Sequence, residues 1–110
     1  MATDAAPPQA RFVVTYDTPS DVEAFERHYR EVHIPLVKQQ PGLRRMTLSH
    51  RPTGVIGPAP YLVVMMDWDD LASLQADLES AAGQRTVDDA TTNLARYATF
   101  RGITMELADA

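Results

Sequence analysis

Apolar and polar residues alternate in several short stretches of the chain, and this period of two is typical of β-strands. Residues 11–16 and 43–50 alternate in this way, and residues 97–107 are rich in strand-forming residues. Residues 61–66 read Tyr-Leu-Val-Val-Met-Met and are apolar in both phases. Such a strand is expected where both faces of a sheet are covered. The pattern therefore predicts four strands, one of them buried on both sides.

A helical period replaces the alternation between the first two strands. The apolar residues that share one face of this helix are Val22, Phe25, Tyr29, Val32 and Leu36. His33 lies at the edge of that stripe, so its ring is expected to point towards the core. Ser20 and Glu23 match a capping box at the start of the helix. Pro35 has no backbone N–H and disfavours helical geometry before it, so the helix is expected to end or kink just after His33.

The second half of the chain predicts two further helices. The first is expected to begin at Asp69 or Asp70, which would cap it, and to end at Gly83, which would supply a left-handed residue. Its apolar positions are Leu71, Leu74 and Leu78, and those of a further short helix are Val87, Ala90 and Leu94. Pro41-Gly42 predicts a turn. Residues 51–60 hold three of the eight prolines and two of the five glycines, which predicts a loop.

The order of these elements predicts an α+β fold. A β-α-β-β-α-(α)-β sequence folds naturally as a ferredoxin-like βαββαβ sandwich, with helices on one face of a four-stranded antiparallel sheet. We expect residues 11–108 to form this single domain and residues 1–10 to form a flexible N-terminal tail. Because residues 61–66 offer apolar side chains to both sides, a second copy is expected to cover the open face of the sheet. The sequence therefore predicts a homodimer.

Composition and charge narrow the function classes. The net charge of −5 argues against nucleic-acid binding, which needs a basic surface. Basic residues nevertheless concentrate before residue 52 and acidic residues after it. This asymmetry is compatible with an anionic ligand, with charge matching between subunits or, as the favoured alternative, with two solvated faces. The start of the chain resembles neither a signal peptide nor a membrane span, and the absence of cysteine fits a reducing compartment. A cytoplasmic protein without membrane contact is expected.

The residues around His33 resemble a known family. Tyr29, His33, Pro35 and Leu36, followed by Pro41-Gly42-Leu43, are similar to the Y-x-x-x-H-x-P-L and P-G-L pattern of the EthD family. Asp67 to Leu71, with Trp68 in place of a usual phenylalanine, and Asp89 are similar to a weaker second pattern. This family belongs to the dimeric α/β-barrel superfamily. The resemblance implies a homodimer whose sheets form a barrel, with a pocket between each sheet and its helices.

His33 is the candidate catalytic residue. Imidazole titrates near neutrality, and an apolar cavity lowers its pKa, so His33 suits proton abstraction beside a carbonyl. The alternative is a buried histidine that bonds backbone groups freed by Pro35. Tyr29 lies about one turn earlier and either shares the pocket with His33 or packs in the core.

Four further residues are candidates for the ligand pocket. Tyr16 and His50, at the ends of the first two strands, are placed to rim a cavity, and Met66 to form part of an adaptable apolar wall. Trp68 is a candidate for stacking on an aromatic ligand. The structural alternatives are a strand end that reaches solvent, which we prefer for His50, and core packing for Trp68 and Met66.

Neither a metal nor an organic cofactor is expected. His28 and His33 lie five residues apart, roughly 140° around a regular helix, and no acidic residue joins either at ligand spacing. Gly54 and Gly57 do not make a phosphate loop, and the glycine pattern of dinucleotide sites is absent. The acidic cluster at residues 67–70 lacks the remaining features of a calcium loop.

The leading hypothesis is a cofactor-independent enzyme that acts on an apolar carbonyl or aromatic compound. An isomerase or cyclase ranks first, and a cofactor-free monooxygenase is a variant. The main alternative is a non-catalytic ligand-binding or accessory protein of a degradative or biosynthetic pathway. A third possibility is a dimeric scaffold whose cavity is filled by side chains. A cavity beside His33 would keep the first two alternatives.

Overall fold

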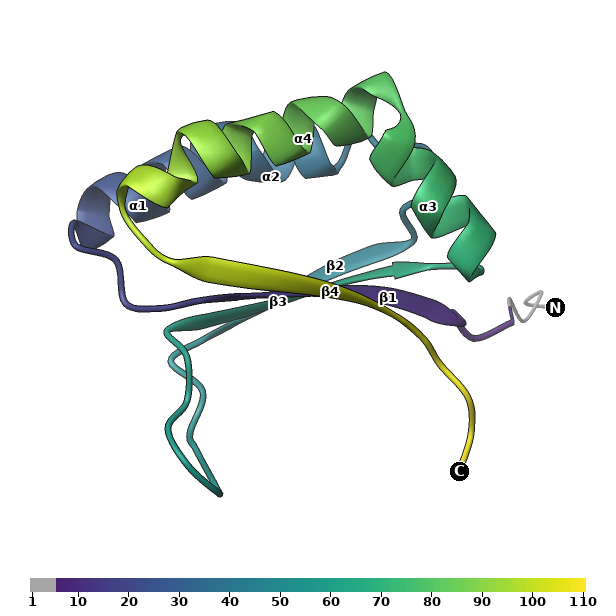
Figure 1. The fold of residues 1–110 in the computed structure, drawn as a ribbon, viewed down its shortest axis with the longest axis horizontal. Coiled ribbons are helices and arrows are strands. Elements are labelled where there is room, and N and C mark those ends of the chain that lie inside the picture. Colours follow the sequence, from purple (N-terminus) through teal and green to yellow (C-terminus); the bar gives the residue numbers. More distant parts are fainter. Residues whose placement is uncertain (1–5) are drawn as a thin grey trace, which may run out of the picture.

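A four-stranded antiparallel sheet forms one layer of the molecule, and the helices form the other (Figure 1). The computed structural model describes residues 6–110. The strands are β1 (Ala10–Tyr16), β2 (Arg45–His50), β3 (Leu62–Trp68) and β4 (Phe100–Glu106). Their order in the sheet is β2-β3-β1-β4, and every neighbouring pair is antiparallel. This arrangement confirms the ferredoxin-like α+β fold.

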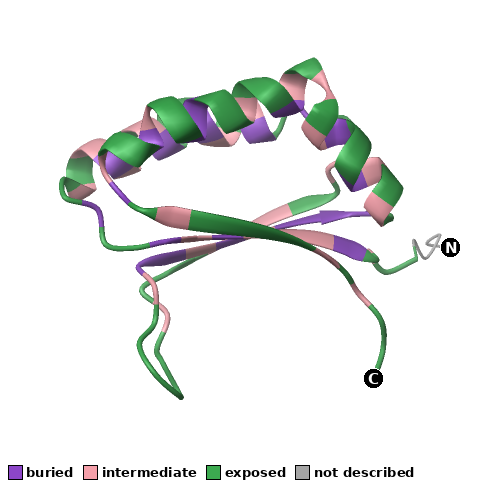
Figure 2. Cartoon of the chain, viewed as in Figure 1, coloured by how far each residue is buried: buried purple, intermediate pink, exposed green. Residues whose placement is uncertain are grey.

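The helical layer covers one face of this sheet. Its elements are α1 (Val22–His28), the π-helical segment η1 (Tyr29–His33), α2 (Ile34–Val37), α3 (Leu71–Glu79), α4 (Ala81–Thr92) and the 3-10 turn η2 (Leu94–Arg96). In Figure 2 the buried positions of the helices lie mainly on the side of the helical layer that is towards the sheet. Among the described residues, no helix is long and apolar enough to span a membrane.

The register of the strands decides which side chains face the helices. Val14 of β1 lies between Val64 of β3 and Gly102 of β4, and both valines are buried. Because side chains alternate between the faces of a strand, neighbouring positions point to the open face. There Val13 lies between Met65 and Ile103, and Ile103 remains 57% exposed. The open face thus carries a row of apolar side chains across three strands, without helices over it (Figure 1).

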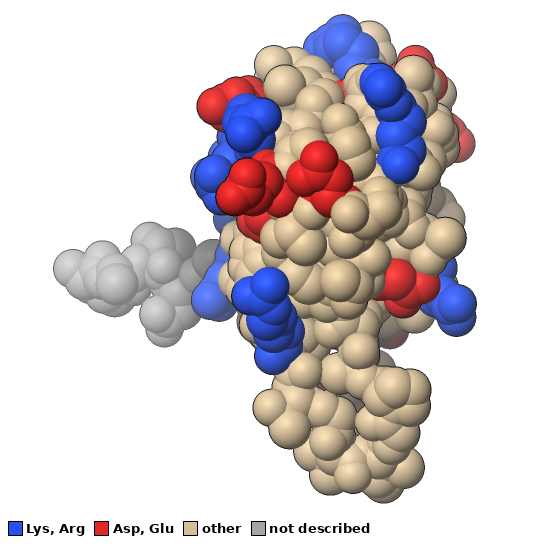
Figure 3. Space-filling model, turned by 90° about the vertical axis from the view of Figure 1, so that its left-hand side faces the viewer, with Lys and Arg blue, Asp and Glu red and all other residues tan. Residues whose placement is uncertain are grey.

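The loop between β2 and β3 extends beyond the open face of the sheet (Figure 1). Val55 and Ile56 are 93% and 96% exposed in it, and residues 52–60 contain no charged residue. Figure 3 shows this uncharged protrusion below a surface on which basic and acidic side chains are interspersed. Arg44 lies 3.2 Å from Asp69, and Arg11 lies 2.6 Å from Asp67. Charges from the two halves of the chain therefore pair in part.

The helix boundaries correct two expectations. Asp21, rather than Ser20, caps α1 by accepting a hydrogen bond from the Ala24 amide. Gly83 does not end α3, because α3 stops at Ser80, whose hydroxyl accepts from the Gly83 amide and caps α4. A Cβ at Gly83 would lie 2.0 Å from the Asp77 carbonyl oxygen. Gly83 is therefore required by the close approach of two helices rather than by a left-handed turn.

Asp77 holds the Pro41-Gly42 turn against the end of β3. Its Oδ2 accepts from the Gly42 amide at 2.8 Å and from the Trp68 indole at 2.7 Å. A Cβ at Gly42 would lie 2.9 Å from that oxygen, so a larger residue does not fit without movement. This buried carboxylate gives the Pro-Gly-Leu sequence and Trp68 a structural role.

The predicted N-terminal tail lies partly outside the described residues, which begin at residue 6. Where the chain is described, Gln9 donates its amide to the Trp68 carbonyl and accepts from the Leu107 amide. Ala10 already belongs to β1. The expectation of a flexible tail is therefore wrong for Gln9 and Ala10, since both have backbone partners on either side of β1, at the end of β3 and of β4.

Candidate active site

A cavity of about 200 Å³ lies between the sheet and the helices. Its walls come from β1, β3 and β4 on one side and from the helical layer on the other. The lining residues are Phe12, Val14, Tyr16, Tyr29, His33, Val37, Gln40, Met66, Leu78, Thr86, Val87, Ala90, Thr91, Phe100 and Gly102. The exposed ones, Val87, Thr91 and Gly102, belong to α4 and β4, so the cavity opens between these elements. Its presence contradicts a scaffold filled by side chains.

The π-helical segment η1 brings Tyr29 and His33 into this cavity. The Ile34 amide donates to the Tyr29 carbonyl, five residues back, where a regular helix would use a partner four residues back. Pro35 explains the wider turn, because the ring of a proline inside a regular helix collides with the carbonyl four residues before it. The chain accommodates Pro35 by widening and continues as α2, rather than ending after His33.

The wider turn also corrects the predicted buried face. Val32 is 39% exposed, and Leu36 is only half-buried, whereas His33 and Val37 are buried. The π-helical turn holds one residue more than a regular turn. Every side chain after Tyr29 is therefore rotated around the helix axis by about the angle of one residue. His33 therefore lies in the middle of the buried stripe and not at its edge.

His33 forms a hydrogen bond with Asp89 of α4. The distance from His33 Nδ1 to Asp89 Oδ2 is 2.8 Å, and the His33 side chain is 6% exposed. An ionised carboxylate only accepts, so Nδ1 carries the hydrogen and the Nε2 of a neutral ring keeps its lone pair. No described residue bonds Nε2, which is therefore the nitrogen available to a ligand. The expected alternative of a bond to freed backbone is wrong, since His33 uses a carboxylate.

Asp89 also binds a second histidine. His28 Nε2 lies 2.8 Å from Asp89 Oδ1, and the Asn93 amide donates to the same oxygen at 2.8 Å. The expectation that His28 and His33 point about 140° apart, with no acidic residue joining either, is wrong, because it assumed a regular helix. In a π-turn, residues five apart lie on the same side, so both rings reach one carboxylate. Among residues 6–110, no group of three His, Cys, Asp or Glu side chains, this one included, is arranged so that it could hold a metal ion.

These contacts set the protonation states at the cavity. Burial lowers the pKa of His33 below its ordinary value, although the contacts with Asp89 oppose this effect. Burial disfavours the charged form of Asp89, but hydrogen bonds from Asn93, His33 and His28 outweigh it and lower the pKa of Asp89. The site therefore holds an ionised carboxylate beside a neutral imidazole at neutral pH, which is the state that a general base needs.

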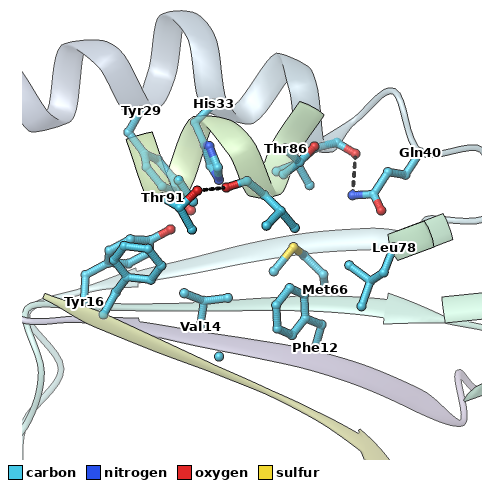
Figure 4. Close-up of a pocket in the computed structure, with 15 residues that line it drawn as sticks. Phe12, Val14, Tyr16, Tyr29, His33, Gln40, Met66, Leu78, Thr86 and Thr91 are labelled. Atoms are coloured by element: carbon cyan, nitrogen blue, oxygen red, sulfur yellow. Dashed lines mark hydrogen bonds between the residues drawn. The ribbon is translucent and has the colours of Figure 1, made fainter. Parts of the chain in front are cut away.

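Tyr16 and Tyr29 bring their hydroxyl groups together at one end of the cavity, with His33 beside them (Figure 4). The two tyrosine rings lie 5.5 Å apart, and the rings of Tyr29 and His33 lie 5.0 Å apart. Burial raises the pKa of Tyr16 to about 12 and that of Tyr29 well above its ordinary value. Both phenols therefore keep their hydrogens at neutral pH. Because the two hydroxyls also bond each other, one of them is left as a donor to a carbonyl oxygen.

The other predicted pocket residues divide between two locations. Met66 lines the cavity together with Tyr16, Tyr29 and His33. His50 lies elsewhere, with its ring 3.1 Å from Glu26 and 43% of its side chain exposed. Trp68 is fully buried and bonds Asp77. Placing His50 and Trp68 at the pocket was wrong, because their strand ends lie at Glu26 and at the Pro41-Gly42 turn instead.

Sequence reasoning missed Gln40, His28 and Asn93. Gln40 is buried in the cavity wall just after α2, where the sequence predicted only the end of a helix. His28 lacked a signal because its partner lies 61 residues away along the chain. The signal for Asn93 was its position four residues after Asp89, at the C-terminal cap of the same helix.

Comparisons with known proteins support the family resemblance. The EthD domain model matches residues 18–95. An 11.0 kDa protein from the thcB-thcC intergenic region of Rhodococcus erythropolis, itself uncharacterized, is 29% identical over 90% of this chain and 92% of its own length. The structure of an EthD family protein from Bacillus halodurans has a TM-score of 0.76 at 29% identity, over 90% of this chain and 99% of that chain.

Two more distant structures share the fold alone. The cofactor-independent oxygenase SnoaB from Streptomyces nogalater has a TM-score of 0.66 at 17% identity, over 94% of this chain and 97% of its own. A dimeric ferredoxin-like protein from Thermobifida fusca has a TM-score of 0.66 at 11% identity, over 91% of this chain and 92% of its own. The match of the EthD domain model to most of the chain is more specific evidence of its family than either of these two similarities in fold. The protein with this cavity and this histidine belongs to the EthD domain family.

Proposed function

We propose that this protein is a cofactor-independent enzyme that moves a proton on an apolar carbonyl or aromatic compound, with His33 as the general base. The observation that carries the proposal is the bond between His33 Nδ1 and Asp89 at the wall of an apolar cavity. This bond fixes the tautomer whose Nε2 accepts a proton, and the carboxylate stabilises the imidazolium that forms.

The two tyrosines supply the other half of the reaction. A ligand carbonyl at the Tyr16 and Tyr29 end would accept a hydrogen bond from a phenol that stays protonated. His33 Nε2 would then take a proton from the carbon next to that carbonyl, and the negative charge would develop on the bonded oxygen. Return of the same proton to another carbon completes an isomerisation. Attack of the new carbanion on a second carbonyl of the ligand, which then takes the proton, completes an aldol cyclisation.

The composition of the cavity wall supports an apolar ligand. Most of its residues are hydrocarbon or aromatic, and no Lys, Arg, Asp or Glu is among the described residues that line it. The basic residues of the first half of the chain do not surround the cavity, which disfavours an anionic ligand. The same wall suits a binding protein without turnover, so ligand binding is the second candidate function.

Deuterium exchange tests the proposed chemistry without knowledge of the natural product. Wild-type protein would be incubated in D₂O with aryl methyl ketones, aryl β-diketones and unsaturated lactones, and deuterium next to the carbonyl would be measured by mass spectrometry. We expect exchange above the buffer rate for at least one class and its loss in His33→Asn. His50→Asn is the matched control, because His50 also has a carboxylate partner but lies away from the cavity.

The outcomes separate the two candidate functions. Saturable binding of these compounds, without exchange by wild type, would refute the enzyme and leave the binding protein. Exchange that survives in His33→Asn would refute His33 as the base. A cofactor-free monooxygenase is a variant in which the histidine deprotonates a hydroxylated aromatic and the anion reacts with dioxygen. It predicts oxygen consumption that also depends on His33.

We also propose a homodimer that buries the open face of the sheet. The row of Met65, Val13 and Ile103 is apolar and uncovered in one chain, which is uncommon for a stable monomer. A second copy placed sheet against sheet would cover it.

A further inference from the structure

Asp89 accepts hydrogen bonds from two imidazole rings, one on each of its carboxylate oxygens. Its Oδ2 lies 2.8 Å from His33 Nδ1, and its Oδ1 lies 2.8 Å from His28 Nε2. In each bond a ring N–H donates to the carboxylate, so a further proton would enter at the opposite nitrogen of that ring. Either ring is therefore able to become an imidazolium without losing its bond to Asp89.

The shared carboxylate limits how many protons the two rings hold. Asp89 carries one negative charge, which balances one imidazolium. A second imidazolium would leave a positive charge without a counter-charge in a site where the His33 side chain is only 6% exposed, and burying such a charge is unfavourable. The two histidines therefore titrate as a coupled pair, in which a proton on one ring disfavours a proton on the other.

The surroundings of the two rings differ. The His28 side chain is 24% exposed, so water partly solvates its charged form. His33 lies at the wall of an apolar cavity, and the ring of Tyr29 is 5.0 Å from its own. Burial lowers the pKa of His33 and the charge of His28 lowers it further, although the contacts with Asp89 oppose both effects. The first proton that the pair gains is therefore less unfavourable on His28 than on His33.

The other titratable groups around the pair do not compete for Asp89. Tyr16 of β1 and Tyr29 of η1 keep their hydrogens at neutral pH, because burial raises the pKa of both phenols. Glu26, two residues before His28, bonds His50 instead. The charged side chains that neighbour the two histidines and Asp89 along their helices are exposed, and they are Arg27, Arg30, Glu31, Arg85, Asp88 and Arg96.

We infer that His28 is a positioning residue that acts through Asp89: it holds the first proton that the pair gains, and so keeps Nε2 of His33 free as a base in mild acid. The Asn93 amide donates to the same carboxylate oxygen as His28, at 2.8 Å, and holds the carboxylate in place whichever ring is charged. This inference deepens the proposed function and rests on it for the role of His33 as the base.

Titration of the histidines by nuclear magnetic resonance tests the inference without a ligand. Long-range ¹H–¹⁵N correlation spectra show which nitrogens of each ring carry hydrogen, and they would be recorded between about pH 4.5 and about pH 8. In wild type we expect His28 to gain its proton at a higher pH than His33. In His28→Gln the amide nitrogen replaces Nε2 as the donor to Asp89 but takes up no proton. We expect the titration midpoint of His33 to rise in this variant by at least about half a pH unit.

Two further variants complete the comparison. His28→Lys keeps a positive charge beside Asp89 throughout the titration, so His33 should gain its proton at the wild-type pH or below it. His50→Gln removes a histidine that also has a carboxylate partner but lies away from the cavity, and it should leave His33 unchanged. Because the two His28 variants are expected to differ in the direction of their effect, a folding defect would not imitate the result.

Three outcomes would overturn the inference. One is a wild type in which His33 gains its proton before His28 or together with it. Another is a His33 midpoint that does not change in His28→Gln. The third is an equal rise of that midpoint in His28→Gln and His28→Lys, because the charge on residue 28 would then have no effect. Circular dichroism would confirm that each variant is folded.

Deuterium exchange into an aryl methyl ketone separates this inference from the proposed reaction. In His28→Gln the exchange rate should begin to decline at a higher pH than in wild type, and it should be about threefold lower in acid but little changed at pH 8. The expected titrations without any exchange would refute the reaction and support the proton preference of the pair. Exchange that depends on His33, with the same decline in acid in wild type and His28→Gln, would refute the role of His28 alone.

Discussion

His33 and Asp89 lie 56 residues apart in the chain, yet their side chains meet at 2.8 Å. The meeting depends on the π-helical segment, which turns His33 inwards, and on α4, which carries Asp89 over the same cavity. The other oxygen of the carboxylate binds His28 and Asn93. Asp89 is therefore the centre of a four-residue cluster that holds one imidazole at the cavity wall.

Asp89→Asn should separate proton transfer from ligand binding. An asparagine keeps the size of the side chain, but it removes the charge that stabilises imidazolium and is able to donate to Nδ1, which favours the wrong tautomer. We expect the exchange rate to fall about 100-fold or more, while affinity for the aryl ketone probes changes little. The matched control is Asp88→Asn, because Asp88 is adjacent but exposed. An unchanged exchange rate in Asp89→Asn would contradict the role of the carboxylate.

The stability of the fold should decrease on mild acidification. The pKa of His33 is lower in the folded protein than its ordinary value of about 6.5, so the unfolded chain binds the proton more readily. By linkage, the free energy of unfolding falls as pH drops below about 6.5 and levels off below the folded pKa. Asp89 adds a second loss at lower pH: the stability from its lowered pKa is present above the unfolded value and is lost as pH falls through the folded one.

Urea unfolding between pH 7.5 and pH 5 would measure the first of these effects. The dependence should be weaker in His33→Asn than in wild type, because the remaining histidines are common to both proteins. A wild type that becomes more stable towards pH 5, or a variant with the same dependence, would contradict a neutral buried imidazole.

Gly102→Ala should reduce the cavity without disrupting the sheet. A Cβ at Gly102 would lie 2.7 Å from the ring of Phe12, and both residues line the cavity. The end of the Phe12 ring is the far end of a side chain that is able to move, and because Phe12 lines the cavity we expect the ring to shift towards it. We expect the affinity for acetylnaphthalene, an aryl methyl ketone with two rings, to fall about tenfold or more, with little change in melting temperature. Thr104→Ala on the same strand is the control, since Thr104 does not line the cavity. Unchanged affinity in Gly102→Ala would show that the ring yields elsewhere.

The open face of the sheet predicts a dimer that a single charge disrupts. Ile103 is 57% exposed and lies beside Val13, at the β4 end of the apolar row. Burying a glutamate there without a partner is unfavourable. Light scattering should give a dimer for wild type at micromolar concentration and a monomer, or a much weaker dimer, for Ile103→Glu. Val55→Glu in the exposed loop tip is a control for a charge outside the sheet face. A monomeric wild type would contradict the proposed interface.

The strands and their order were predictable because local patterns determine them. Alternation located β1 and β2 within a few residues, and the content of strand-forming residues located β4. The apolar character of residues 61–66 in both phases located β3, one of the two inner strands of the sheet. The period of two survives in the fold because each strand lies in one regular sheet. The helical stretch from α1 to α2 was harder to predict, since its period changes within a few residues.

The buried positions Phe25, Tyr29, His33 and Val37 contain the signal for this change. They follow one another at a constant spacing of four, which drifts by about 40° per step in a regular helix. Val32 and Leu36 fit the period of a regular helix better, and the pattern therefore predicted them on the buried face. Only the position of Pro35 indicated that the regular period would not hold.

The partners of the site were beyond local patterns. No residue near His28 in the sequence indicates that Asp89 is its partner, and no residue near Asp89 indicates His28. Their contact depends on how α1 and α4 pack. His50 and Trp68 lie at the ends of strands, as a pocket residue would, but hydrogen bonds to Glu26 and Asp77 hold them elsewhere. Strand ends alone therefore do not identify the lining of a cavity.

The single extra residue in η1 affects how relatives of this chain should be aligned. In a homologue whose helix is regular throughout, the residue paired with His33 by an ungapped alignment would face about 100° away from the cavity. The residue that corresponds to His33 in space would then lie in the neighbouring column of the alignment. Alignments across this helix therefore need a one-residue gap wherever the π-turn is missing, and apparent variability at the His33 column is to be judged only after that gap is placed.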